Sequence, residues 1–452
     1  MNYIKMKHKL LQSSNYIYII PAYIISEIAM IPLGAKLAET HGVKRTLIPA
    51  SLLFTVGSML CVVSVSVEML TVFRFVMGLG AGLFLGMAFT SVGRYYENGT
   101  RGRCHELMTA AFALGSLFSA AIGYFLVDNF NWRMGFVVLS IAAIIGTVIA
   151  YRELPKDDGE GTKLDIVNAI LVIALFGVAA FFTQEVNVDF DLMSWTSLLI
   201  IAIVIVLLFA AMYHSKISSN PLIPRGVSSM EKKMILLMFM FSMCGLGLIQ
   251  YFFKLYLVYY EFDVYSASLM FLLLIAGAAG PSILGSRIVL KTGVRPWIVI
   301  GSILVAISLV LTHFIVGDGK VQFALSVFVI GIGLGCIVTQ LIISLQSITP
   351  RETMGTHTGN LMATRMIGIV MGNAVVGAYI KGIKEAGHTI ETIDISQVED
   401  VLISIGERIV GDLQYVSGSL FNGFTDTVLV MAVVALLLAI VAYTLGKDDK
   451  IE

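Results

Sequence analysis

The sequence predicts an all-α protein that crosses a membrane many times. Of its 452 residues, 57% are hydrophobic and only 13% carry a formal charge, whereas soluble globular chains are nearer a quarter charged. Apolar runs of about twenty residues, the length that spans a bilayer as a helix, recur from end to end. Helices are expected because lipid offers no partner to backbone amides and carbonyls.

The apolar runs predict thirteen spans. They are expected at residues 16–37, 46–66, 67–92, 106–127, 134–151, 164–184, 195–213, 234–258, 265–286, 297–316, 321–346, 358–380 and 425–446. We divide the chain into an N-terminal bundle (1–151), two central spans with polar linkers (152–233) and a C-terminal bundle (234–452). The last contains an outer loop at 384–423, with an amphipathic pattern of apolar residues.

The positive charges predict the orientation. With residues 34–45 on the cytoplasmic side, 19 of the 30 Lys and Arg fall in cytoplasmic loops or the C-terminus, against five in the opposite loops, as the positive-inside rule requires. The C-terminus is then cytoplasmic. An odd number of spans leaves the basic N-terminus outside, so we expect a further helix upstream of Met1; a chain of thirteen spans is the alternative.

An internal repeat explains the segment "GAKLAETHGVKR" at residues 34–45. It returns as "GSRIVLKTGVRP" at 285–296, and "RFVMGLGAG" (74–82) returns as "VFVIGIGLG" (327–335). We interpret both copies of the first segment as charged turns between helices. Two related six-helix halves around a central site are typical of secondary transporters.

These motifs resemble the major facilitator superfamily, and specifically its fourteen-span drug:proton antiporter branch. "GAKLAETHGVKR" resembles the signature turn between the second and third helices, "RFVMGLGAG" the fourth-helix motif, and "NWRMGF" the Trp-Arg corner before the sixth helix. "LDIVNAIL", "SWTSLLI" and "NPLIP" resemble the landmarks of two extra central helices, and "TGNLMATRMIGIVMG" the thirteenth helix. The fold implied is two six-helix bundles with two extra central helices.

The same resemblance implies gating and coupling residues. The gating turn comprises Gly34, Glu39, Gly42, Lys44 and Arg45, in which Glu39 is expected to meet a cation or a helix N-terminus of the other half; the alternative is an ordinary positive-inside loop. Because charges inside spans are costly, Glu27 and Arg74 are candidates for proton coupling or substrate binding, with a structural ion pair as the alternative. Cavity candidates are Gln250, Tyr251, Lys254, Thr339, Gln340, Asn360 and Arg365. The alternative is that these side chains only hydrogen-bond helices to one another or, for Lys254, reach the membrane surface.

The predicted function is proton-coupled export of small amphipathic or hydrophobic compounds by alternating access in the cytoplasmic membrane. In the fifth helix, "GSLFSAAIGYF" (115–125) lacks the proline of the antiporter motif, so a lipid or glycolipid flippase, or an uncoupled facilitator, is the alternative. Expected partners are a small-molecule substrate, protons and membrane lipids, with the chain acting as a monomer. A net charge of zero argues against nucleic acid, and no enzyme activity, cofactor or metal site is predicted.

Overall fold

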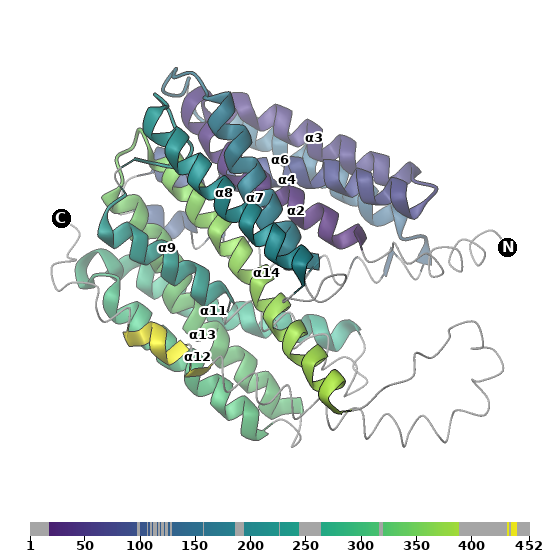
Figure 1. The fold of residues 1–452 in the computed structure, drawn as a ribbon, viewed down its shortest axis with the longest axis vertical. Coiled ribbons are helices and arrows are strands. Elements are labelled where there is room, and N and C mark those ends of the chain that lie inside the picture. Colours follow the sequence, from purple (N-terminus) through teal and green to yellow (C-terminus); the bar gives the residue numbers. More distant parts are fainter. Residues whose placement is uncertain are drawn as a thin grey trace.

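The helices form two groups that lie side by side with one long helix between them (Figure 1). The computed structural model describes residues 18–96, 100–105, 129–156, 158–185, 194–225, 227–243, 264–315 and 320–387, with scattered residues between 107 and 126 and between 432 and 440. The first half contains α2 (Ile19–His41), α3 (Val43–Val63), α4 (Val67–Tyr95) and α6 (Arg133–Glu153).

The second half and the central helices follow in the chain. The second half contains α9 (Ser229–Phe241), α11 (Val264–Thr292), α12 (Arg295–Ile315), α13 (Lys320–Ile348) and α14 (Met354–Gly387). The central helices α7 (Ile166–Glu185) and α8 (Trp195–Ile217) pack on each other. Since α7 contacts both α2 and α14, it lies against both halves.

Glycines reproduce the internal repeat in three dimensions. In α4, a Cβ on Gly78 or Gly82 would lie 2.0 Å and 2.1 Å from atoms of α2, while one on Gly80 would lie 2.3 Å from α3. In α13, the corresponding Gly331 and Gly335 face α11, and Gly333 faces α12. In each triplet, the first and third glycines therefore allow the close approach of one neighbouring helix, and the middle glycine allows the close approach of the other. This close helix packing agrees with the small-residue spacing of the sequence.

The two segments interpreted as charged turns are almost entirely helical, which corrects the predicted spans. Helix α2 continues to His41 and α3 begins at Val43, so Gly42 alone interrupts them, with φ of 84°. In the second copy α11 ends at Thr292, α12 begins at Arg295, and Gly293 has φ of 76°. Charges do not end these helices; the left-handed backbone of one glycine does.

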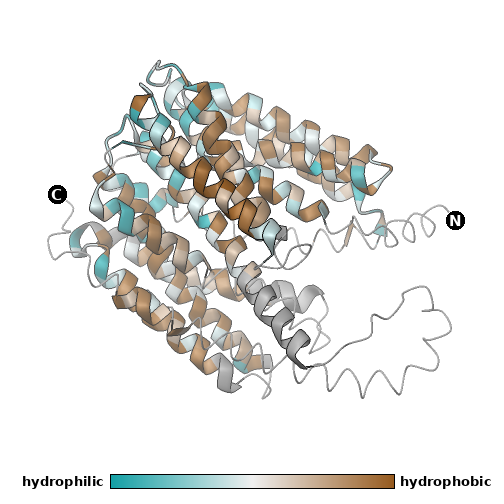
Figure 2. Cartoon of the chain, viewed as in Figure 1, coloured by the Kyte–Doolittle hydropathy of each residue, from teal (hydrophilic) through white to brown (hydrophobic). Residues whose placement is uncertain are grey.

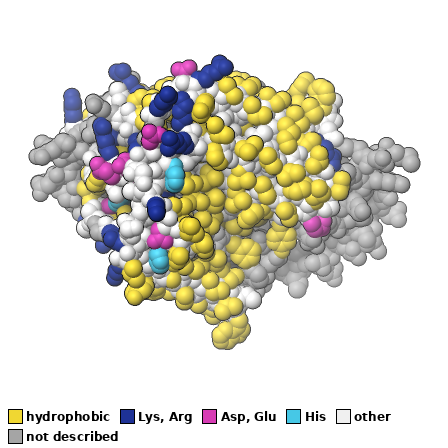
Figure 3. Space-filling model, turned by 90° about the horizontal axis from the view of Figure 1, so that it is seen from above, with side chains coloured by type: hydrophobic (Ala, Val, Ile, Leu, Met, Phe, Trp, Pro, Cys, Tyr) yellow, Lys and Arg dark blue, Asp and Glu magenta, His cyan; other side chains and the backbone are white. Residues whose placement is uncertain are grey.

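The outer surface matches a protein surrounded by lipid. Within the described residues, seven helices are long and apolar enough to cross a membrane. Helix α8 is apolar yet mostly exposed, with outward residues such as Leu199, Val206 and Phe209, and it shows as a continuous hydrophobic stretch in Figure 2. From above, hydrophobic side chains cover the middle of the molecule and charged ones gather at one end (Figure 3). An apolar belt with charge beyond it is the arrangement a bilayer requires.

Several expected features lie outside the described residues. They include the whole outer loop at 384–423 except its first residues, and most of the spans at 106–127 and 425–446. The span expected at 234–258 is described only as far as residue 243. The helix expected upstream of Met1 stays a prediction.

Candidate gating and coupling site

Glu39 lies at the end of the molecule where α2 and α4 finish and α14 begins, called the charged end below. The carboxylate is buried, and the Nζ atom of Lys36 lies 2.5 Å from its Oε1 atom. Both residues belong to α2, three positions apart, so the helix itself brings them to one face. A buried charge needs such a partner and further hydrogen bonds.

The further hydrogen bonds come from the other half. The backbone amide of Thr356 donates to Oε2 of Glu39 at 2.8 Å, and its hydroxyl donates to the same oxygen at 2.9 Å. Thr356 is the third residue of α14, so its amide is one of those a helix leaves unsatisfied at its start. A carboxylate there also interacts favourably with the positive end of the helix dipole. The expected contact of Glu39 with a helix N-terminus of the other half is thus present.

Two glycines of α14 allow this approach. A Cβ on Gly355 would lie 2.7 Å from the carbonyl oxygen of Ala35, and one on Gly359 would lie 2.5 Å from the Cβ atom of Ala35. Any larger side chain at these positions would push α14 away from α2. The two halves are therefore in direct contact at the charged end, which is closed.

The other members of the predicted gating turn make contacts within the first half and its linker. Lys44 donates to the carbonyl of Leu154 at 3.1 Å and lies over the ring of Tyr151. Arg45 pairs with Asp158 at 2.8 Å, with both side chains largely exposed. Gly42 breaks the helix, and Gly34 allows α4 to approach, since a Cβ there would lie 2.3 Å from the carbonyl oxygen of Leu83. Of the five, Glu39 alone reaches the second half through its side chain.

A second set of contacts between the halves was not predicted from the sequence. Gln346, at the end of α13, donates to the carbonyl of Phe89 at 3.1 Å and contacts Nε2 of His105 at 3.0 Å. Arg101 donates to the carbonyl of Gln346 at 2.8 Å. All three side chains are buried. A glutamine at the end of an apolar run is the only sequence signal, and it is a weak one.

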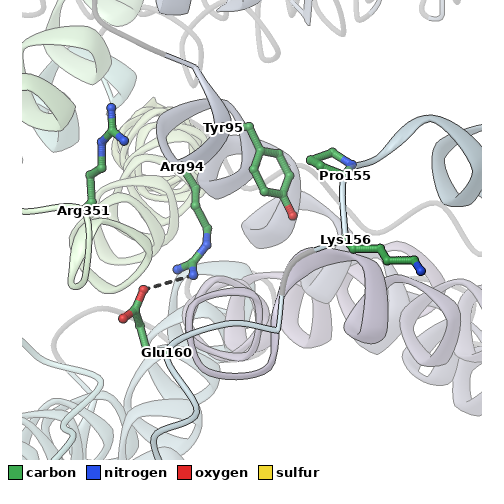
Figure 4. A pocket seen from close by; sticks show the side chains of 6 residues that line it. All are labelled: Arg94, Tyr95, Pro155, Lys156, Glu160 and Arg351. Atoms are coloured by element: carbon green, nitrogen blue, oxygen red, sulfur yellow. Dashed lines mark ion pairs between the residues drawn. The ribbon is translucent and has the colours of Figure 1, made fainter.

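The linker after α6 joins the same network. Arg94 of α4 pairs with Glu160 at 3.0 Å (Figure 4) and donates to the carbonyl of Glu39 at 3.4 Å. The amides of Glu160 and Gly161 donate to the carbonyls of Glu39 and Thr40. The free carbonyls at the end of α2 are thus satisfied by the segment that leads to the central helices.

The linker after α8 is held by two asparagines. The backbone amide of Leu222, within the "NPLIP" motif, donates to Oδ1 of Asn168 on α7 at 2.7 Å, and its carbonyl accepts from Asn360 on α14 at 2.6 Å. All three residues are buried. Beside them, His357 of α14 contacts the carboxylate of Glu231 on α9, also buried. Asn360, predicted as a cavity residue, therefore holds the linker in place.

Glu27 and Arg74, the predicted coupling pair, do not pair with each other in the structure. The carboxyl of Glu27 has neither a hydrogen bond nor an ion pair with any described residue. The guanidinium of Arg74 lies over two aromatic rings, 5.7 Å from the centroid of Tyr23 and 4.9 Å from that of Phe136. Its Nε atom is buried and has no hydrogen-bond partner among the described residues. Tyr23, whose ring contacts Arg74, lies one turn before Glu27 on α2.

The remaining cavity candidates have mixed positions. Thr339 donates to Ser282 at 3.1 Å, and Gln340 donates to the carbonyls of Pro281 and Gly335, which ties α13 to α11 and the turn of its own helix. Arg365 is half-buried, and its Nε atom has no partner. Gln250, Tyr251 and Lys254 lie outside the described residues. Within the part described, no group of three or more His, Cys, Asp or Glu side chains is placed to hold a metal ion.

Comparison with known proteins identifies the family. The family described as the Major Facilitator Superfamily matches residues 6–373, so the chain belongs to this superfamily of secondary transporters. It is 24% identical over 374 residues to the multidrug transporter protein MdtP of Bacillus subtilis, covering 79% of this chain and 67% of MdtP. It is also 24% identical over 372 residues to the drug efflux pump JefA of Mycobacterium tuberculosis, covering 80% of this chain and 72% of JefA.

Solved structures show the same fold. The human organic anion transporter MFSD10 superposes with a TM-score of 0.64 at 14% identity, over 95% of this chain and 83% of that one. The proton:xylose symporter XylE gives a TM-score of 0.60 at 14% identity, over 95% and 85%. Membership of the superfamily and the multidrug relatives make the protein a membrane-embedded secondary transporter that takes a small-molecule substrate.

Proposed function

We propose that this transporter exports small amphipathic or hydrophobic compounds from the cytoplasm across the cell membrane, as a monomer, in exchange for protons. The observation that carries the proposal is the closed charged end, where Glu39 of the first half binds the N-terminus of α14 in the second. Alternating access requires contacts that hold one entrance shut and can be exchanged for another set.

The orientation proposed for this entrance is cytoplasmic, with the C-terminus on the same side. Support comes from the concentration of Lys and Arg at the charged end, which Figure 3 displays for one face, and from the preference of cations for cytoplasmic loops. In this orientation the structure corresponds to a state closed to the cytoplasm. A substrate entering from the cytoplasm must wait until Glu39 and Thr356 separate.

Glu27 is the proposed proton carrier. It lies on α2, three turns before Glu39, so the two carboxylates are about 18 Å apart along the axis at 1.5 Å per residue. A carboxyl without a partner inside a membrane is stable mainly in its protonated form. Water or a cation that reaches this carboxyl would favour its ionised form, and the proton would then be released. Because α2 also carries Glu39, rocking of α2 changes the surroundings of Glu27 and the Glu39–Thr356 contact together.

The proposed substrate class follows from the relatives and from the composition. MdtP and JefA are a multidrug transporter and a drug efflux pump, and the chain contains 22 methionines, whose flexible side chains suit apolar ligands of varied shape. Arg365 provides a half-buried cation on α14 for a polar group of the substrate.

The test is transport by the purified protein in liposomes. An imposed proton gradient should drive accumulation of a fluorescent amphipathic dye, and dissipating the gradient should stop it. Glu27→Gln should abolish accumulation, whereas Glu153→Gln, an exposed carboxylate at the end of α6, should retain it. Movement of labelled phospholipid without dye transport would instead identify a flippase. Dye equilibration that ignores the gradient in the unmodified protein would identify an uncoupled facilitator.

A further inference from the structure

A charged pocket lies at the charged end, beside the Glu39–Thr356 contact but separate from it. Its volume is about 290 Å³, and it is lined by Arg94, Tyr95, Pro155, Lys156, Glu160 and Arg351. Three parts of the chain meet here: the end of α4, the linker after α6, and the turn between α13 and α14. Figure 4 shows Arg94 directed at Glu160, with Arg351 on one side and Lys156 on the other. The pocket thus joins the two halves.

The pocket carries an excess of positive charge. Its lining has three cations and one carboxylate, and that carboxylate is already paired with Arg94. Lys156 and Arg351 are exposed, and neither forms an ion pair with any described residue. Both have long side chains that can turn toward a ligand at little cost, and Arg can hold a phosphate with two hydrogen bonds.

Repulsion between cations adds to this excess. Burial is the main cause that lowers the pKa of Arg101, and the nearby charge of Arg351 lowers it further. Arg101 is 4% exposed and is fixed by its hydrogen bond to the carbonyl of Gln346, so it cannot move away. An anion placed between these cations would relieve the repulsion, because opposite charges at short range favour the charged forms of both.

We propose that this pocket binds a phosphate-bearing anion, either a free phosphate compound or a phospholipid headgroup. Four of the six lining residues carry a charge, and Tyr95 and Pro155 supply apolar surface beside them. The concentration of charge suits an anion better than the amphipathic compounds proposed for transport. The pocket lies where α4 and α13 end. Because the ends of membrane spans meet both lipid headgroups and water, both sources of phosphate can reach it. This inference does not depend on proton coupling or on the transported substrate.

The bound anion would favour the closed state. Arg94 holds the end of α2 through the carbonyl of Glu39, Lys156 follows α6 in the first half, and Arg351 belongs to the second half. An anion that contacts both Arg351 and Lys156 links the halves only while the charged end is shut. By linkage, a ligand that binds one of two states shifts the population toward that state.

The experiment has two arms, each applied to the whole purified protein. In the first, inorganic pyrophosphate is titrated into the protein in detergent, and binding is followed by calorimetry. In the second, nanodiscs containing phosphatidylglycerol are compared with nanodiscs of phosphatidylcholine, and retained lipid is measured by native mass spectrometry. Each arm also records, with spin labels, the distance between the halves at the charged end, which should move toward the closed value when the anion binds.

Arg351→Gln and Lys156→Gln test the pocket itself. Each should weaken binding about fivefold or more, the loss expected for one charge-assisted contact. Both positions are exposed, so the fold is retained. Lys163→Gln removes an exposed cation of the same linker outside the pocket and should change binding less than twofold. A response to pyrophosphate identifies a free anion, and a response confined to phosphatidylglycerol identifies a headgroup. Absence of binding in both arms, or an equal loss in Lys163→Gln, overturns the proposal.

Discussion

Replacing Glu39 with Gln should open the charged end, and the structure allows the size of the effect to be worked out. When the halves separate, Lys36 stays three residues away on the same helix, so the Lys36–Glu39 pair survives. The contacts exchanged for water are the two hydrogen bonds from Thr356 to Oε2 of Glu39, at 2.8 Å and 2.9 Å, and the one from Nζ of Lys36 to the hydroxyl of Thr356, at 3.0 Å. A hydrogen bond to a charged group contributes about 1.5–3 kcal/mol net, and Gln keeps a neutral acceptor for part of it.

The expected loss is about 1–2 kcal/mol of preference for the closed state, a factor of roughly 5–30. A protein that is about 95% closed would fall to roughly 65% closed at a tenfold shift. In Glu39→Gln, the buried Lys36 lies beside a neutral amide, and an unpaired buried charge is strongly unfavourable. The loss of preference for the closed state should therefore be near the upper limit of this range. The double variant Lys36→Gln with Glu39→Gln removes that contribution and should lie between Glu39→Gln and the unmodified protein.

The measurement is the distance between spin labels at Arg152 and Lys291, which are exposed at the charged end of α6 and α11, on a background without native cysteines. Glu39→Gln should populate a longer distance, and turnover should fall because the transporter leaves the closed state too readily. An unchanged distance distribution in a folded Glu39→Gln protein would show that Glu39 does not hold the gate.

Three further results are expected. Glu27→Gln should abolish uphill efflux while downhill exchange continues, and concentrative efflux at the unmodified rate would make Glu27 structural. Gly82→Ala should lower the melting temperature by several degrees, because its Cβ would meet the backbone of α2 at 2.1 Å, whereas Gly135→Ala, with open space around it, should change little. Burial lowers the pKa of His105 to about 4 from an ordinary 6.5, so the closed state binds the proton less readily than an open state in which this ring is hydrated. The closed population should therefore fall as the pH drops from 6.5 toward 4, as followed by the same label distance, and His105→Asn should remove most of this pH dependence.

Much of the fold was predictable because lipid leaves the backbone few choices. Hydropathy located the helices, and the repeat of "GAKLAETHGVKR" and of the glycine triplets predicted two equivalent halves, which the packing of α4 on α2 and of α13 on α11 confirms. The ends of helices were less predictable. The residues from Gly34 to Arg45 were interpreted as a turn because they are charged, yet the pairing of Lys36 with Glu39 and burial against α14 let the helix continue to His41.

The site was only partly predictable, because contacts between the halves join residues hundreds of positions apart. Glu39 was identified through its motif, but its partner Thr356 has no distinguishing sequence feature. Gln346 and His105 meet across 241 positions, which no local pattern records. Asn360 was a cavity candidate, with hydrogen bonding between elements as the alternative, and its side-chain amide donates to the carbonyl of Leu222.

The attachment of Leu222 limits how the transporter can move. Leu222 connects the central helices to the second half, because it is hydrogen-bonded to Asn168 on α7 and to Asn360 on α14. The linker before α7 is hydrogen-bonded to the first half, because the amides of Glu160 and Gly161 donate to carbonyls at the end of α2. The charged end cannot open widely while both sets of hydrogen bonds remain. The bonds at Leu222 are buried, whereas Glu160 and Gly161 are exposed, so water can replace the latter far more readily. The two central helices should consequently move with the second half, and α7 should slide against α2, on which it also packs. The linker of residues 158–162 should serve as the hinge.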